Sequence, residues 1–140
     1  MARITSMPST VLVIDDDTAA IQMLKETLES YSFKVITAQI VQEGIEVARE
    51  CKPDVIVIDL FMTGLSGGQI CRAIREFTRV PILVLTAMTK PGAVAQALNE
   101  GADDYLIKPV SAGVLVAHLN NLIRRAHGEN GARAVSVNPL

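Results

Sequence analysis

The stretches VLVIDDD at residues 11–17 and VIVID at residues 55–59 decide the expected fold. In each of them, four apolar residues that favour β-strands run directly into aspartate. Strands that are apolar on both faces are typical of buried parallel sheets. Two later stretches, ILVLT at 82–86 and YLIK at 105–108, also end in a polar residue. Ligands of an open α/β sheet bind beyond the carboxyl ends of its strands, so these polar residues predict a binding site.

From residue 10 onward, short apolar runs alternate five times with segments of helical periodicity. This alternation predicts an α/β fold in which five helices flank a five-stranded parallel sheet. The run KVITA is the least hydrophobic and is expected at an edge, whereas VIVI is expected at the centre, which favours the strand order 2-1-3-4-5. The expected strands cover residues 10–15, 34–38, 54–59, 81–86 and 104–108.

The length of 140 residues fits a single domain. We expect residues 1–9 to be a flexible lead-in and residues 10–126 to form the folded domain. Residues 127–140 lose helical periodicity and gain Gly, Asn and Pro, so they are expected to be a flexible tail or linker stump. Asp17 and Ser111 are expected to cap the first and last helices.

The overall charge and the apolar runs bear on partners and location. The 13 basic and 15 acidic side chains give a net charge of −2, which predicts no direct contact with nucleic acid or an anionic membrane. No apolar run approaches the roughly 20 residues that a membrane helix needs. The first ten residues lack the apolar segment of a secretion signal, which favours a cytoplasmic location.

The polar residues at the strand ends suggest the chemistry of the site. Asp15 and Asp16 follow the first strand and Asp59 follows the third, so their carboxylates are expected to converge. Three carboxylates repel one another unless a cation neutralises them, and an oxygen-only set suits Mg²⁺. Lys108 is expected to pair with Asp59 and then with a phosphoryl oxygen, to which Thr86 donates a hydrogen bond. Acidic residues at helix starts and threonines in strands are also common without any such role.

The motifs VLVIDDD, VIVIDLFMTGLSGG, ILVLTA and GADDYLIKP resemble, in this order and spacing, the receiver domain of bacterial two-component response regulators. The resemblance extends from residue 10 to about residue 126 and is specific, because four motifs fall at the ends of four strands. It implies a flavodoxin-like (βα)₅ fold and a signalling switch that accepts a phosphoryl group from a histidine kinase, a phosphotransfer protein or a small phosphodonor. Such a domain catalyses only its own phosphorylation and slow dephosphorylation, and is not otherwise an enzyme.

The resemblance also implies roles for single residues. Asp59 would be the phosphoacceptor. Asp15, Asp16, Asp59 and the backbone carbonyl of Phe61 would be the protein ligands of Mg²⁺.

Thr86 and Lys108 would bind phosphoryl oxygens, and Thr86 and Tyr105 would form the conformational switch. The peptide bond between Lys108 and Pro109 is expected to be cis. The switch would reshape the face formed by the fourth helix, the fifth strand and the fifth helix, through which a downstream protein or output domain is controlled.

Some residues depart from the family pattern. Val114 and His118 replace two charged residues through which many receivers dimerise, which leaves a monomer and a phosphorylation-dependent dimer both open. The bulky Phe61 and Met88 should obstruct an attacking water and slow the loss of phosphate. A receiver-fold docking module without regulated phosphorylation is the alternative function, whereas a dinucleotide-binding module would need a GxGxxG motif that the chain lacks after its first strand.

Overall fold

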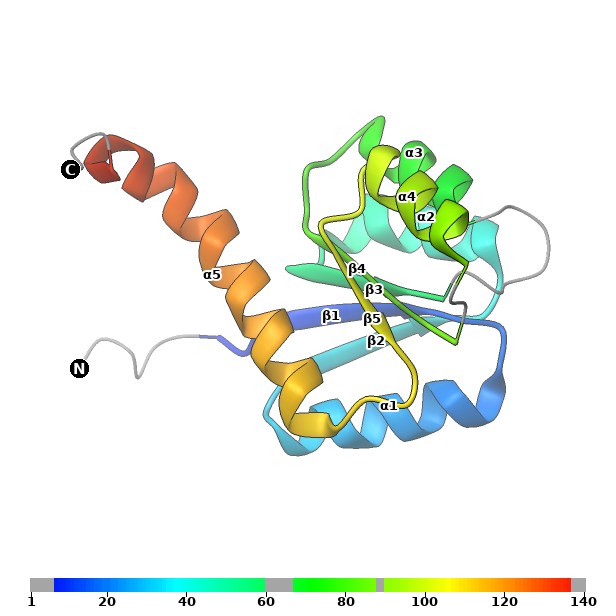
Figure 1. The fold of residues 1–140 in the computed structure, drawn as a ribbon. Coiled ribbons are helices and arrows are strands. Elements are labelled where there is room, and N and C mark those ends of the chain that lie inside the picture. Colours follow the sequence, from blue (N-terminus) through cyan, green and yellow to red (C-terminus); the bar gives the residue numbers. More distant parts are fainter. Residues whose placement is uncertain (1–6, 60–66, 88–89, 137–140) are drawn as a thin grey trace.

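A computed structural model describes residues 7–59, 67–87 and 90–136 of the chain (Figure 1). Strands and helices alternate throughout, as the sequence predicts. The elements in chain order are β1 (Thr10–Ile14), α1 (Thr18–Ser30), β2 (Lys34–Ala38), α2 (Val41–Cys51), β3 (Val55–Ile58), α3 (Gly67–Arg75), β4 (Ile82–Thr86), α4 (Pro91–Asn99), β5 (Asp104–Ile107) and α5 (Ala112–Ser136).

The sheet has the order β2-β1-β3-β4-β5, and all of its strand pairs are parallel. This confirms the predicted fold class and strand order. All four residues of β3 are buried at the centre of the sheet, whereas Lys34 at the start of the edge strand β2 is exposed. A strand that is covered on both faces has to be apolar throughout, and an edge strand does not.

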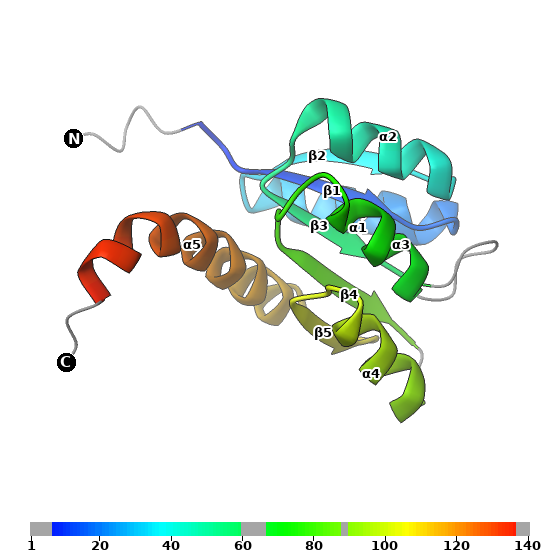
Figure 2. The same cartoon turned by 90° about the horizontal axis from the view of Figure 1, so that it is seen from above.

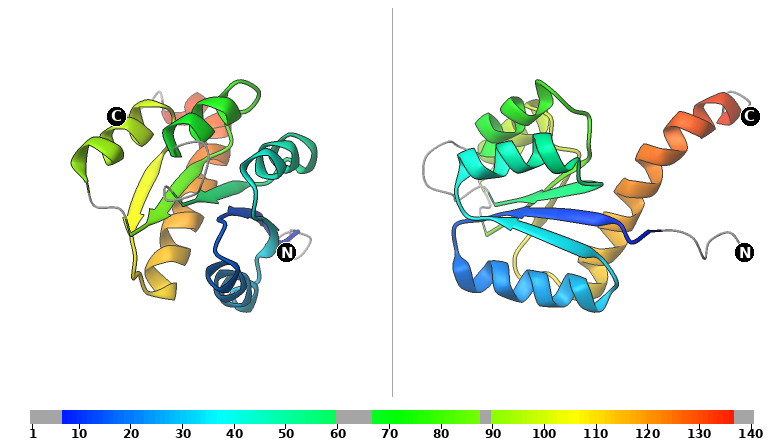
Figure 3. Two further views of the ribbon diagram at one scale, coloured as in Figure 1. Left: turned by 90° about the vertical axis from the view of Figure 1, so that its right-hand side faces the viewer. Right: turned by 180° about the vertical axis from the view of Figure 1, so that it is seen from behind.

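Helices cover both faces of the sheet, as Figure 3 shows end-on. Side chains of successive strand residues point to opposite faces, so each strand contributes to two cores. Leu12 and Ile14 pack with α2, α3 and α4 on one face, whereas Val11 and Val13 pack with α1 and α5 on the other. Complete burial of one such side chain stabilises the fold by roughly 1.5–3 kcal/mol, so the two cores hold the domain together.

Helix boundaries follow the expected capping residues. The carboxylate of Asp17 accepts hydrogen bonds from the backbone N–H groups of Ala19 and Ala20, and so caps α1. The hydroxyl of Ser111 accepts from the N–H of Val114 at the start of α5. Both caps satisfy N–H groups that have no partner within the helix.

The last helix is longer than the sequence analysis predicted. We expected helical structure to end near residue 126, but α5 continues to Ser136 and projects beyond the sheet (Figure 2). Gly128 and Gly131 weaken a helix by only about 1 kcal/mol each, and the first residue that would break it is Pro139. The Ala residues in this stretch favour the helix, so the loss of apolar periodicity was not a signal for its end.

Candidate functional site

The carboxyl ends of the two central strands bring two acidic residues together. Ile14 of β1 and Ile58 of β3 are register partners, and Asp15 and Asp59 are the residues that follow them. The N–H of Asp59 donates to the carbonyl of Ile14 at 3.2 Å, and the N–H of Asp15 donates to the carbonyl of Ala38 at 3.1 Å. Backbone hydrogen bonds therefore fix both residues, and both are buried.

Lys108 closes the site from the end of β5. Its ammonium Nζ lies 3.1 Å from Oδ2 of Asp59 and 3.5 Å from Oδ2 of Asp15. Its backbone N–H donates to the carbonyl of Thr86 at 2.9 Å, which ties the end of β5 to the end of β4. The peptide bond between Lys108 and Pro109 is cis, as predicted. The expected pairing of Lys108 with Asp59 is confirmed.

The charges of the site do not balance. Burial raises the pKa of Asp15, the hydrogen bond from the N–H of Asp17 opposes this rise, and the negative charge of Asp59 adds to it. Burial lowers the pKa of Lys108, but the hydrogen bond and charge of Asp59, together with Asp15, outweigh burial and leave it raised. Lys108 is therefore charged at neutral pH. One ammonium faces two carboxylates, and the excess negative charge would be neutralised by a further cation.

The carboxylates of Asp15 and Asp59 are the groups that could bind such a cation. Across residues 7–59, 67–87 and 90–136, no group of three or more His, Cys, Asp or Glu side chains is assembled as a metal site. Mg²⁺ usually binds one or two carboxylates and completes its shell with water and phosphate oxygens, so the pair of Asp15 and Asp59 fits it. Asp16 lies exposed beside them, and Phe61 lies outside the described residues.

The two residues expected to form the switch lie on neighbouring strands. Thr86 ends β4 and is completely buried. Tyr105 lies on β5, is half-buried and packs against the core on the α2, α3 and α4 side. Burial raises the pKa of the Tyr105 hydroxyl. Val84 of β4 is the register partner of Tyr105, so the two switch residues lie two positions apart along the strand pair.

One contact near this site was missed by the sequence analysis. Nδ1 of His118 on α5 lies 2.6 Å from Oδ2 of Asp104 on β5. From the sequence, His118 is only a departure from the charged dimerisation pattern, and no partner is predicted for it. A periodicity argument places His118 and Asp104 on their own elements but gives no register between a strand and the helix that packs on it.

Comparisons with known proteins identify the family. The response regulator receiver domain family matches residues 11–120. The chain belongs to this family. The receiver domain is 39% identical over 124 residues to the transcriptional regulatory protein AfsQ1 of Streptomyces coelicolor, covering 89% of this chain and 55% of that protein. It is 35% identical over 124 residues to the DNA-binding response regulator MtrA of Mycobacterium tuberculosis, covering 89% of this chain and 54% of that protein. The chain thus spans about half the length of these curated relatives.

Solved structures agree with this assignment. A response regulator receiver domain protein from Clostridium thermocellum is 35% identical, with a TM-score of 0.80, and the match covers 85% of this chain and 97% of that one. The receiver domain therefore has the flavodoxin-like (βα)₅ fold that the sequence motifs implied. It is a signalling module homologous to two-component response regulators.

The relatives correct one prediction. We expected no direct contact with nucleic acid, but MtrA is a DNA-binding response regulator and AfsQ1 is a transcriptional regulatory protein. The prediction was wrong because it rested on the net charge of 140 residues, whereas these relatives are much longer than the matched stretch. For the membrane, no helix within the described part of this receiver domain is long and apolar enough to cross a bilayer.

Proposed function

We propose that this receiver domain is a phosphorylation-activated switch of a two-component system and that Asp59 accepts the phosphoryl group. The observation that carries the proposal is the contact of 3.1 Å between Oδ2 of Asp59 and Nζ of Lys108 at the carboxyl ends of β3 and β5. A carboxylate oxygen of Asp59 attacks phosphorus as the bond from phosphorus to the donor breaks. The donor would be a phosphohistidine of a histidine kinase or phosphotransfer protein, or a small acyl phosphate.

The neighbouring residues would bind the transferred group. Lys108 pairs with Asp59 at rest and would move its charge to a phosphoryl oxygen, and the hydroxyl of Thr86 would donate to another. Asp15, Asp16, Asp59 and the carbonyl of Phe61 would hold Mg²⁺. When bound, Mg²⁺ would neutralise charge on the phosphoryl oxygens. Catalysis in such a site is mostly positioning and electrostatic stabilisation, which these fixed backbones favour.

Phosphorylation would then change the face formed by α4, β5 and α5. A phosphoryl group adds roughly −1.5 to −2 charges and three acceptor oxygens. The hydroxyl of Thr86 would turn toward this charge, and Tyr105 on the neighbouring strand would move into the space that it leaves. Since AfsQ1 is a transcriptional regulatory protein and MtrA is DNA-binding, we propose that the controlled output is DNA binding and transcription.

The test is phosphorylation by acetyl phosphate and Mg²⁺, followed by intact mass. The wild type should gain the mass of one phosphoryl group, and the Asp59→Asn variant should gain none. Asp54→Asn is the matched control, because Asp54 lies at the opposite end of β3, where its carboxylate accepts from the N–H of Thr10 at 2.7 Å. The Asp54→Asn variant should be phosphorylated like the wild type. Absence of any mass gain in the wild type would favour the alternative of a docking module.

The cytoplasmic location of this receiver domain stays a prediction.

A further inference from the structure

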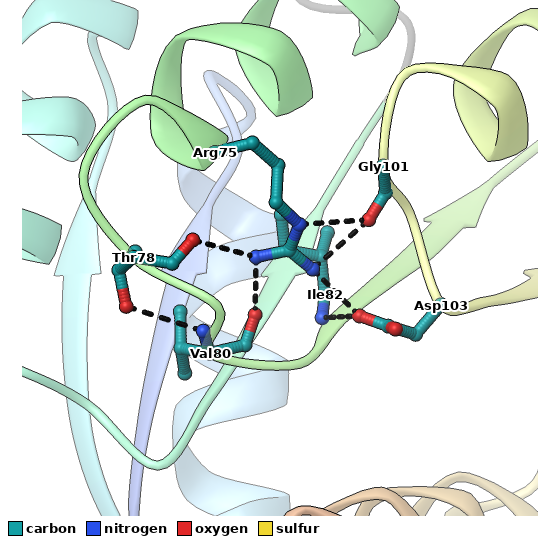
Figure 4. Close-up of polar contacts among 6 residues, drawn as sticks. All are labelled: Arg75, Thr78, Val80, Ile82, Gly101 and Asp103. Carbon is teal, nitrogen blue, oxygen red and sulfur yellow. Dashed lines mark hydrogen bonds and ion pairs between the residues drawn. The ribbon is translucent and has the colours of Figure 1, made fainter.

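Arg75, the last residue of α3, contacts four residues from two other segments of the chain, at the end of the sheet opposite Asp59 (Figure 4). Its guanidinium donates to the carbonyl of Gly101 through Nε at 3.1 Å and through Nη2 at 2.9 Å. It also donates through Nη1 to the carbonyls of Val80 at 2.6 Å and Thr78 at 3.3 Å. These contacts tie the end of α3 and the loop before β4 to the residues that follow α4.

Asp103 extends this connection into the sheet. Its Oδ2 lies 2.7 Å from Nη2 of Arg75 and also accepts the N–H of Ile82, the first residue of β4, at 2.8 Å. The N–H of Asp103 in turn donates to the carbonyl of Ile82 at 2.8 Å. The chain between α4 and β5 is thus fixed to both α3 and β4. The side chain of Arg75 is 15% exposed and that of Asp103 is 41% exposed, so solvent reaches this ion pair from the Asp103 side and screens it in part.

A second arginine holds the end of α4 itself. Nε and Nη2 of Arg72 donate to the two carboxylate oxygens of Glu100 at 2.8 Å and 2.7 Å, which is the paired geometry that favours Arg over Lys. A Cβ at Gly68 of α3 would lie 3.1 Å from Cγ of Gln96 and 3.4 Å from Cγ of Glu100. The two helices are therefore in close contact along this stretch.

The other end of α4 has no comparable anchor among the described residues. Lys90 is the N-cap residue but makes no side-chain capping hydrogen bond, and Pro91 and Gly92 are exposed. A Cβ at Gly92 would have no atom within 4 Å. The only fully buried residue of α4 is Ala97, which lies in its second half. Anchoring of α4 is thus concentrated at the end that lies away from Asp59.

We propose that Arg72 and Arg75 make the C-terminal end of α4 a fixed pivot, so that activation moves its N-terminal half. This inference rests on the proposed function, because phosphorylation of Asp59 is the event that would drive the movement. Arg75 acts as a positioning residue, since it lies at the opposite end of the sheet and contacts neither Asp59 nor Lys108. A pivot at one end converts a small change near β4 and β5 into a larger displacement of the first turn of α4.

Hydrogen exchange of single amides tests the anchoring in the resting protein. The N–H groups of Glu100 and Ala102 donate to Gln96 and Ala97 at 2.9 Å and 3.0 Å, and that of Val94 donates to Lys90 at 3.2 Å. We expect the amides of Glu100 and Ala102 to exchange at least about tenfold more slowly than that of Val94. Equal exchange along α4 would overturn the anchoring.

Variants link this protection to the arginines. Arg75→Lys keeps the charge but loses the paired N–H groups, and it should speed exchange at Glu100 and Ala102 by about tenfold or more while leaving Val94 nearly unchanged. Arg79→Lys changes an exposed arginine in the loop before β4 and serves as the matched control without this effect. If Arg75→Lys does not fold, the exposed Arg72→Ala variant gives the same test with an expected change of about twofold to fivefold. Faster exchange at both ends of α4 would contradict the proposal.

Amide chemical shifts before and after phosphorylation test the pivot. We expect the largest changes within α4 in its first turn, near Ala93 and Val94, and small changes at Glu100. Intact mass on the same sample reports the phosphoryl group. Phosphorylation with changes that are as large at Glu100 as at Val94 would overturn the pivot alone. Absence of phosphorylation would instead overturn the proposed function, and the pivot with it.

Discussion

Replacing Gly101 with alanine should destabilise the receiver domain strongly, for two reasons that act at the same position. Gly101 follows the end of α4 with φ at +125°, a conformation that alanine rarely adopts. The added Cβ would also lie 2.7 Å from Cγ and 3.1 Å from Nε of Arg75. The side chain of Arg75 is held by its own hydrogen bonds, so it would have to leave the carbonyl of Gly101 to make room.

The size of the effect follows from these two costs. Backbone strain at such a position is about 1–3 kcal/mol. Loss of the two hydrogen bonds from Arg75 to the carbonyl of Gly101 adds about 1 kcal/mol each. The reduced entropy of the unfolded chain returns about 0.4–1 kcal/mol. The free energy of unfolding should therefore fall by about 3 kcal/mol, which is a large part of the usual 5–15 kcal/mol of a domain.

Urea unfolding followed by circular dichroism measures this change, because the chain contains no Trp for fluorescence. Gly113→Ala is the control, since Gly113 lies in α5 and a Cβ there would meet nothing within 4 Å. Alanine at Gly113 should stabilise the protein by about 0.5–1 kcal/mol, because glycine disfavours a helix. A loss below about 1 kcal/mol in Gly101→Ala, or an equal loss in both variants, would refute the reasoning.

Four further predictions concern the site, the two cysteines and the core. Asp15→Asn should raise the free energy of unfolding at pH 7, because the raised pKa of Asp15 means that its charged form is disfavoured in the folded state. Lower stability in urea would contradict this. Burial raises the pKa of Cys71 from 9.0 to about 11, so the unfolded chain loses this proton first, and stability should fall by about 2 kcal/mol between pH 9 and pH 11. At pH 8 a thiol reagent should label the exposed Cys51 promptly and the buried Cys71 only on unfolding, and equal labelling rates would argue against the described burial. Leu119→Ala removes a completely buried side chain of α5 and should cost about 2–5 kcal/mol in urea unfolding, whereas a loss below 1 kcal/mol would show that the core closes around the gap.

Most of the fold could be predicted from the sequence, because the central strands leave few alternatives. The run VIVI is apolar at every position, which fits only a strand that is covered on both faces. The predicted strands agree with the structure to within one residue at each end. The end of α5 was missed because glycine weakens a helix without ending it. The helix and strand propensities of the residues therefore predict the order of the elements more reliably than the residue at which a helix ends.

The site was predictable only in part. The placement of Asp15, Asp59 and Lys108 follows from three strands that end at one edge of a parallel sheet. Contacts between elements were not predictable in the same way. Arg75 ends a helix and Gly101 follows another, and no spacing along the chain indicates that a guanidinium of one would meet a carbonyl of the other. Such contacts depend on the angle and distance at which two helices pack.

Among the described residues, the sheet separates the interior into two apolar compartments, and no side chain belongs to both. Val13 and Ile14 are neighbours in the chain, yet one fills the compartment under α1 and α5 and the other fills that under α2, α3 and α4. A cavity made by a smaller side chain in one compartment is therefore not filled by side chains of the other compartment. Substitutions at Leu119 and at Ile74, from opposite compartments, should add in their effects on stability, because independent sites are additive. Each half of this domain can thus diversify in sequence without requiring a matching change across the sheet.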